Sequence, residues 1–314
     1  MRFEQILGKF QEELRETREF MISHVTRDLG TIKGSDAFAA YPTSQFLRSI
    51  ILFSSATDSR NTTLPLSQIA SVLEYLHLAS KLHRHIPQID EFRRLNKEIA
   101  NWWHNELSIL AGDYFLSISF KILTQLGNMD LLELISNATR LISQGQVLEI
   151  ANGSGTSSEQ IYFEIAGNKT GSLAAAAAVC GSISDNSEMI VRDSYYEFGF
   201  QLGIALQIHD DAQTCANPQM LEYALRENKT LYPICCLLNR FPDQLETREL
   251  LTHLHENHIQ SASQLAYRML SQLAIMPLVE QEISSRLQKA SSSLSKPDQF
   301  EHLMALCQSH NFSV

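Results

Sequence analysis

The chain has 314 residues, of which 44% are hydrophobic and 19% are charged, and its formal net charge is -10. This composition argues against a disordered chain, and the negative charge argues against nucleic acid as a partner. Because no stretch reaches the roughly 20 apolar residues that a membrane-spanning helix needs, we expect no transmembrane segment.

The N-terminal segment indicates where the protein is found. It reads MRFEQILGKFQEELRETREF, which mixes acidic and basic side chains and lacks an apolar signal core. We therefore expect a cytoplasmic protein. The five cysteines show neither a C-x-x-C pair nor the spacing of zinc ligands, which favours buried, reduced thiols.

Helical spacing of apolar residues recurs along almost the whole chain, and strand alternation is nearly absent. Turn-forming residues divide these segments into about a dozen helices of ordinary length. We predict an all-α fold, a single large helical bundle over residues 1–314. Breaks are expected at Gly30 to Thr43, Asp58 to Pro65, Ile86 to Pro87, Gly127, Gly145 to Thr156, Asn217 to Pro218, and Phe241 to Asp243.

Two of these segments are apolar on more than one face, at residues 108–126 and 173–183. Such helices are expected to be surrounded by other helices. The second contains five consecutive alanines, Ala174 to Ala178, whose small side chains predict a close approach between helices.

A series of motifs begins at His83, where the sequence reads H-R-H-I-P-Q-I-D-E-F-R-R, and ten residues later it reads N-E-L-S-I-L-A-G-D-Y-F-L. Four shorter motifs follow in order. Together they resemble the trans-polyprenyl diphosphate synthases in their long-chain form, over roughly residues 45 to 235. The four are Gly145-Gln146, Lys169-Thr170, the stretch from Phe198 to Asp211 that ends in L-Q-I-H-D-D, and N-K-T-L-Y-P from Asn228 to Pro233.

The resemblance implies an isoprenoid synthase fold in which two aspartate-rich clusters hold magnesium ions on an allylic diphosphate. The first cluster is lost here, because Arg84, His85 and Gln88 replace its three aspartates. A gapped alignment would retain Asp90 as the last carboxylate, but it disrupts the match of the following arginine pair. A fixed positive charge at Arg84 would repel divalent cations.

The second cluster is partly retained, with Asp210 and Asp211 present and Thr214 at the last carboxylate position. Two adjacent aspartates could hold a single magnesium through water and phosphate. The alternative interpretation, a solvated helix terminus, remains open at this stage.

Some basic positions that bind diphosphate in the family are also retained. Either lysine among them could instead pair with acids on neighbouring helices. The retained residues that the resemblance assigns to a prenyl diphosphate ligand are Arg48, Arg93, Arg94, Lys169, Gln207 and Lys229.

This combination resembles the non-catalytic second subunit of heteromeric long-chain polyprenyl diphosphate synthases. We therefore expect a chain with little activity alone that supports a catalytic synthase subunit, although a homodimer remains open. One alternative is an active but atypical prenyltransferase or terpene-cyclase-like enzyme that uses Asp210, Asp211 and a basic diphosphate site. A second is a prenyl diphosphate binding module.

Three histidines, His253, His255 and His258, form a further cluster close to Glu256. They lack a paired cysteine or a second group of metal ligands. We expect them to lie on a solvated helix face rather than to bind a metal.

Overall fold

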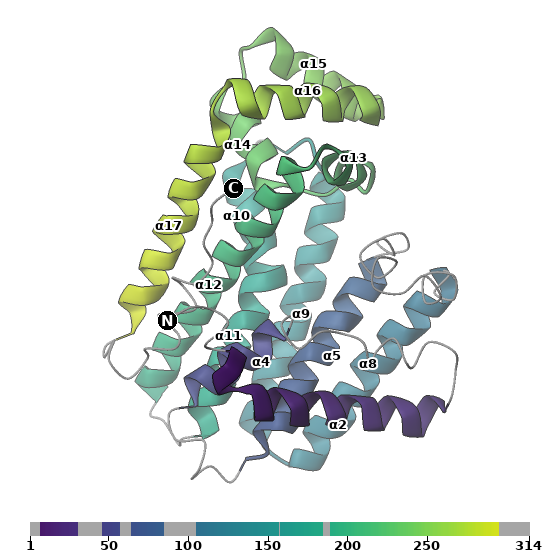
Figure 1. Cartoon of the computed structure of the whole chain (residues 1–314), viewed down its shortest axis with the longest axis vertical. Coiled ribbons are helices and arrows are strands. Elements are labelled where there is room, and N and C mark those ends of the chain that lie inside the picture. The colour runs from purple at the N-terminus through teal and green to yellow at the C-terminus, as the bar shows by residue number, and fades with distance from the viewer. Residues whose placement is uncertain are drawn as a thin grey trace. The chain divides into compact units, whose positions relative to one another are not determined.

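A computed structural model describes residues 7–30, 46–56, 64–84, 105–156, 158–184 and 189–294. The regular elements in these ranges are all helices, so the all-α prediction is confirmed (Figure 1). None of them is long and apolar enough to cross a bilayer. In chain order they are α2 (Gln11–Leu29), α4 (Leu47–Ser55), α5 (Leu66–Arg84), α8 (Asn105–Leu126), α9 (Met129–Asn152), α10 (Glu159–Ala166), the π-helix η2 (Gly167–Gly171), α11 (Ser172–Ser184), α12 (Met189–Ala216), α13 (Pro218–Arg226), α14 (Tyr232–Arg240), α15 (Leu245–His255), α16 (Ile259–Gln272) and α17 (Ile275–Ser293).

The chain divides into two compact units. Unit 1 contains residues 1–139, 173–199 and 294–309, and unit 2 contains residues 140–172, 200–293 and 310–314. The boundaries after residues 139 and 199 fall inside helices α9 and α12. The expectation of one domain over the whole chain stays a prediction.

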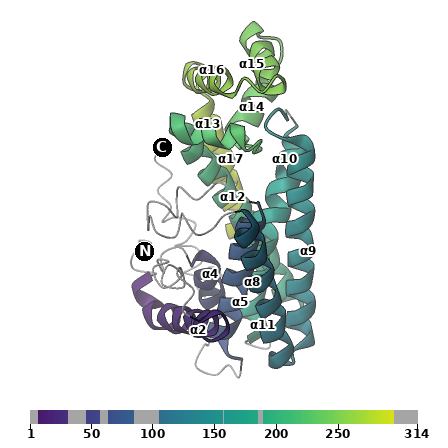
Figure 2. The same cartoon turned by 90° about the vertical axis from the view of Figure 1, so that its right-hand side faces the viewer.

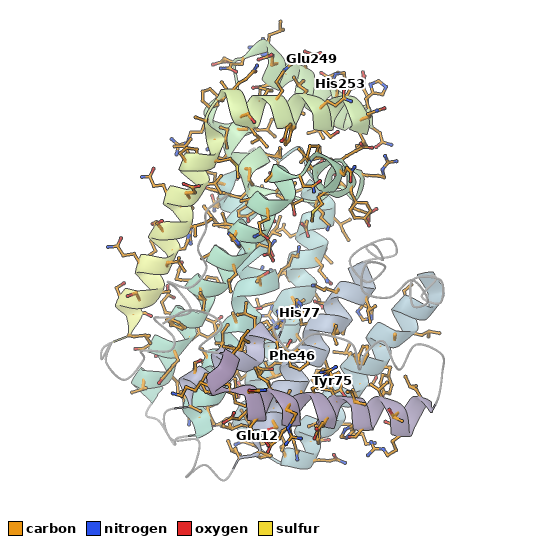
Figure 3. All side chains as sticks on the ribbon, in the orientation of Figure 1. Glu12, Phe46, Tyr75, His77, Glu249 and His253 are labelled. Carbon is orange, nitrogen blue, oxygen red and sulfur yellow. The ribbon has the colours of Figure 1, made fainter. Side chains whose placement is uncertain are left out.

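In unit 1, α5 packs along α8 while α2 lies across α5 (Figure 1). Tyr75 on α5, which Figure 3 labels, is fully buried, and its hydroxyl donates a 2.8 Å hydrogen bond to the carbonyl oxygen of Met21 on α2. Because a buried phenol needs a hydrogen-bond partner, this contact fixes where α2 crosses.

The alanine run on α11 is buried throughout, from Ala174 to Ala178. A Cβ atom added to Gly199 on α12 would lie 2.5 Å from the carbonyl oxygen of Ala174. The predicted close approach of helices is therefore confirmed. The other segment expected to be enclosed, 108–126, exposes Ile109 and Leu110 at fractions of 44% and 63%, so that expectation is wrong near its N-terminal end.

In unit 2, α16 packs against α13 and α15, and α14 packs against α10 and α17 (Figure 2). The start of α13 follows from its sequence. The Asn217 side chain accepts hydrogen bonds from the backbone N–H groups of Gln219 and Met220, and proline occupies the first turn. Both features are typical of a helix start, so the predicted break at Asn217 to Pro218 is confirmed.

Glycines explain one predicted break and the misplaced start of another, the break predicted from Gly145 to Thr156. Gly127 separates α8 from α9 with a φ of +65°, as expected. In contrast, α9 continues through Gly145 and ends at Asn152, before Gly153 with a φ of +66°. Gly145 instead allows the Lys169 side chain to pack closely against α9, because a Cβ atom at position 145 would lie 2.8 Å from Cγ of Lys169.

The expectation for the cysteines is confirmed where the structure describes them. Cys180, Cys215, Cys235 and Cys236 are buried free thiols. Burial raises the pKa of each, which keeps these thiols protonated and unreactive at neutral pH.

Candidate functional site

A π-helical turn, η2, brings two neighbouring polar residues, Lys169 and Thr170, into one network in unit 2. The glycines at both ends of this turn pack against the Phe200 ring: a Cβ atom added to Gly167 or Gly171 would lie 2.7 or 3.0 Å from it. Single π-helical turns are rare and often mark functional sites. Nothing in the apolar spacing of the sequence predicted this one.

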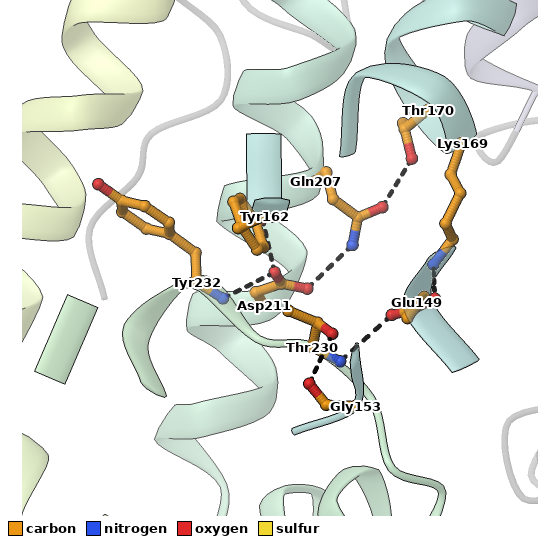
Figure 4. A network of polar contacts seen from close by, with 9 residues as sticks. All are labelled: Glu149, Gly153, Tyr162, Lys169, Thr170, Gln207, Asp211, Thr230 and Tyr232. Carbon is orange, nitrogen blue, oxygen red and sulfur yellow. Dashed lines mark hydrogen bonds and ion pairs between the residues drawn. The ribbon is translucent and has the colours of Figure 1, made fainter. Parts of the chain in front are cut away.

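The Lys169 ammonium forms an ion pair with Glu149 of α9 (Figure 4). The lysine side chain is 15% exposed and the glutamate side chain 4%. The other glutamate oxygen accepts a 3.3 Å hydrogen bond from the backbone N–H of Thr230, whose hydroxyl donates to the carbonyl oxygen of Gly153 at 2.9 Å. Glu149 thus joins η2 to the segment that precedes α14.

Asp211 of α12 is the centre of the same network (Figure 4). One carboxylate oxygen accepts hydrogen bonds from the Tyr162 hydroxyl at 2.7 Å and from the backbone N–H of Tyr232 at 3.1 Å. The other accepts from the amide of Gln207 at 2.9 Å, and the Gln207 carbonyl oxygen accepts from the Thr170 hydroxyl at 2.6 Å. The donors come from α10, η2, α12 and the start of α14.

Opposing influences set the acidity of Asp211. Burial disfavours the charged form and raises its pKa to about 6, while hydrogen bonds from Tyr162, Tyr232 and Gln207 and the charge of Lys169 act against this rise. The carboxylate is therefore mostly ionised at neutral pH. Burial, reinforced by the charge on Asp211, also raises the pKa of the Tyr162 hydroxyl, so Tyr162 stays protonated and donates.

We expect this elevated pKa to produce a pH-dependent stability. Between about pH 4 and pH 6 the folded chain retains a proton that an unfolded aspartate has lost, so the free energy of unfolding falls as pH rises through this window. Urea unfolding at several pH values, compared with Asp211→Asn, isolates this contribution. Parallel pH profiles for the two proteins would contradict it.

The two aspartates of the retained pair have different environments. Asp210 is exposed, whereas Asp211 is buried. Helical spacing contains the signal for this difference, because Asp211 lies three residues after Ile208 and four before Cys215, both buried. The interpretation as a solvated helix terminus therefore fails for Asp211.

The magnesium prediction can be tested against these contacts. Within the described ranges, no three His, Cys, Asp or Glu side chains come together in a way that could hold a metal ion. The Asp211 carboxylate already accepts three hydrogen bonds from protein donors, two on one oxygen and one on the other, which leaves it little capacity for a metal ion. A single magnesium at Asp210 and Asp211 stays a prediction.

Arg48, in unit 1, has a buried acidic partner of its own. It donates to Glu74 of α5 through Nε at 2.9 Å, and Glu74 also accepts from the backbone N–H and the hydroxyl of Ser49, each at 3.0 Å. The glutamate side chain is 1% exposed. This arrangement is that of a structural ion pair.

The remaining predicted diphosphate residues are only partly described. Nζ of Lys229 lies 5.9 Å from the centroid of the Tyr223 ring. Arg84 ends α5, and its side chain lies outside the described residues. The other first-motif and arginine-pair positions, His85, Gln88, Arg93 and Arg94, also lie outside the described residues.

The histidine cluster is mostly exposed, as expected, but His253 is an exception. Figure 3 labels it with Glu249 on α15, and its Nε2 lies 3.6 Å from a carboxylate oxygen of that glutamate. Its side chain is only 24% exposed, and its ring centroid lies 5.9 Å from that of His258. His253 therefore packs at the end of α15, while His255 and His258 face solvent.

The sequence motifs did not predict three partners that complete the network, which are Glu149, Tyr162 and the backbone of Thr230. They lie 20, 49 and 81 residues from the groups they contact. No local pattern could have connected them.

Curated relatives share part of this chain. The octaprenyl diphosphate synthase of Escherichia coli strain K12 is 32% identical over 145 residues, which cover 46% of this chain and 45% of that protein. The chain thus spans about half the length of the curated relatives it matches.

Solved structures show the same fold. A decaprenyl diphosphate synthase from Rhodobacter capsulatus aligns with a TM-score of 0.79 at 20% identity, covering 98% of this chain and 97% of that one. A polyprenyl synthase from Caulobacter crescentus, complexed with calcium and isoprenyl diphosphate, aligns with a TM-score of 0.79 at 21% identity, covering 98% and 96%. The polyprenyl synthetase family itself matches residues 43–269, most of the chain. The chain therefore belongs to the polyprenyl synthetase family.

Proposed function

We propose that this chain is a non-catalytic subunit that supports a catalytic polyprenyl diphosphate synthase in prenyl chain elongation. The observation that carries the proposal is the closed polar network of Figure 4. Asp211 of the second motif has three protein donors, and Lys169 has the Glu149 carboxylate. Two groups that would have to contact a metal or a diphosphate, Asp211 and Lys169, thus have partners within the protein instead.

The amino-acid sequence supports the same conclusion at the first motif. Catalysis in this family requires carboxylates that bridge magnesium to a diphosphate, and Arg84, His85 and Gln88 offer none at the aligned positions. An arginine keeps its charge at every physiological pH, so protonation changes cannot restore such a site.

A subunit role explains why a chain without these ligands keeps the whole fold. The family match spans residues 43–269, and the structural alignments cover nearly the whole chain. A folded body without the metal ligands can still support a partner through its surface. The partner we propose is a synthase with both aspartate motifs intact, encoded in the same genome.

The test is elongation of farnesyl diphosphate by isopentenyl diphosphate with magnesium, assayed for the pure chain, for a motif-intact synthase, and for the mixture. We expect no product above the protein-free background from the chain alone. The mixture should give a higher rate or a longer product than the synthase alone, and the two chains should co-elute on size exclusion.

Two other results would overturn the proposal, and each favours a named alternative. Product from the pure chain that disappears in Asp210→Ala would identify an atypical enzyme that uses the exposed aspartate. Tight binding of farnesyl diphosphate by the isolated chain, without turnover and without any effect on the synthase, would identify a binding module.

A further inference from the structure

Two hydrogen-bond donors converge on Glu149 inside unit 2. The Lys169 ammonium approaches one carboxylate oxygen, and the backbone N–H of Thr230 donates to the other at 3.3 Å. A cation and a backbone N–H from separate segments form a typical cradle for an oxyanion. In this chain the oxyanion is the protein's own glutamate.

We propose that Glu149 occupies an anion-binding site of the phosphate or diphosphate class and keeps such ligands away from Lys169. The carboxylate thus acts as an internal counter-anion, and the site is closed to external phosphate groups in the resting chain. This inference rests on the proposed non-catalytic role. It adds that Glu149 determines whether Lys169 is available to a phosphate ligand.

Packing holds the two charges together. Gly145 and Glu149 lie one turn apart on the same face of α9. The aliphatic part of the Lys169 side chain lies directly over Gly145. A Cβ atom added to this glycine would lie 2.8 Å from Cγ of the lysine. The lysine is therefore directed along α9 toward Glu149, and the glutamate side chain is only 4% exposed.

The internal carboxylate also has an entropic advantage over a free ligand. It is already positioned by the helix, so the pair forms without loss of translational freedom, whereas pyrophosphate must lose that freedom to bind. A free phosphate group would, moreover, have to approach a buried negative charge.

The test is binding of inorganic pyrophosphate by isothermal titration calorimetry in metal-free buffer. Glu149→Gln keeps the size of the side chain and removes its charge. We expect it to bind pyrophosphate at least about tenfold more tightly than the unmodified chain, the gain for one regained charge-assisted hydrogen bond. The gain should disappear in the double variant Glu149→Gln/Lys169→Met, which lacks the ammonium.

A matched control separates this local effect from a change in net charge. Glu246→Gln removes one negative charge from an exposed pair with Arg268, also in unit 2, and should leave pyrophosphate affinity unchanged. Circular dichroism establishes that each variant is folded. A folded Glu149→Gln that binds no better than the unmodified chain overturns the proposal.

If Glu149→Gln does not fold, Lys169→Met tests the same point from the other side. A site already filled by Glu149 predicts an affinity within about twofold of the unmodified chain, whereas a loss of about tenfold would mean that Lys169 is available to ligands and the proposal is wrong. These readouts measure binding without turnover. An active chain in the elongation assay would therefore overturn the proposed function, while the pyrophosphate titration would still report on Glu149.

Discussion

Replacing Asp211 with alanine is expected to lower the free energy of unfolding by about 3 to 5 kcal/mol, one of the largest effects that a single substitution should have in this chain. The carboxylate accepts from the Tyr162 hydroxyl, the Tyr232 backbone N–H and the Gln207 amide. Alanine would leave all three donors without their acceptor; the Tyr162 hydroxyl and the Tyr232 N–H are buried, and each buried donor costs about 1 to 3 kcal/mol. Urea unfolding at pH 7.5, followed by circular dichroism, measures the change.

The neighbouring aspartate provides the matched control. Asp210 has the same chemistry one residue away but is exposed, so Asp210→Ala should change the free energy of unfolding by no more than about 0.5 kcal/mol. Equal losses of stability in the two variants would contradict the assignment of Asp211 as the buried centre of the network.

Gly199→Ala is expected to destabilise unit 1 by about 2 to 3 kcal/mol, although alanine is the better helix former. The added Cβ would lie 2.5 Å from the carbonyl oxygen and 2.8 Å from the carbonyl carbon of Ala174, and 2.6 Å from Cα of Ala175. These are backbone atoms of α11, so a rotamer change cannot relieve the clash. The helices would have to separate and expose part of the alanine interface.

Gly8→Ala is the appropriate comparison, since the Cβ that it adds meets no atom within 4 Å beyond the adjacent residues and the backbone of its own helical turn. Its free energy of unfolding should stay the same or rise by up to about 1 kcal/mol. Thermal and urea unfolding of both variants test the pair, and a stabilising Gly199→Ala would mean that α11 and α12 are not in backbone contact.

Local sequence signals predicted much of the fold. Helical spacing of apolar residues gave the all-α class, and a glycine with positive φ at 127 and an asparagine cap at 217 gave two helix boundaries. These signals work because each depends on the conformation of a few neighbouring residues. Gly145 shows their limit, since a glycine can mark either a break or a close contact.

The candidate site was predicted only in part. Motif resemblance identified Lys169, Gln207 and Asp211, which the structure joins in one network. Their contacts could not be predicted, because the buried acid that neutralises Lys169 lies 20 residues away and the tyrosine that binds Asp211 lies 49 residues away. Pairing at such separations depends on tertiary packing, which one sequence does not reveal.

The three donors around Asp211 also affect how this chain evolves. An aspartate that the fold needs is kept by selection for stability, even in a lineage that has lost catalysis. Selection for stability would therefore preserve Asp211 independently of any selection for metal binding. An aspartate at this position therefore reports an intact fold, and a genome survey should not count it by itself as a sign of synthase activity.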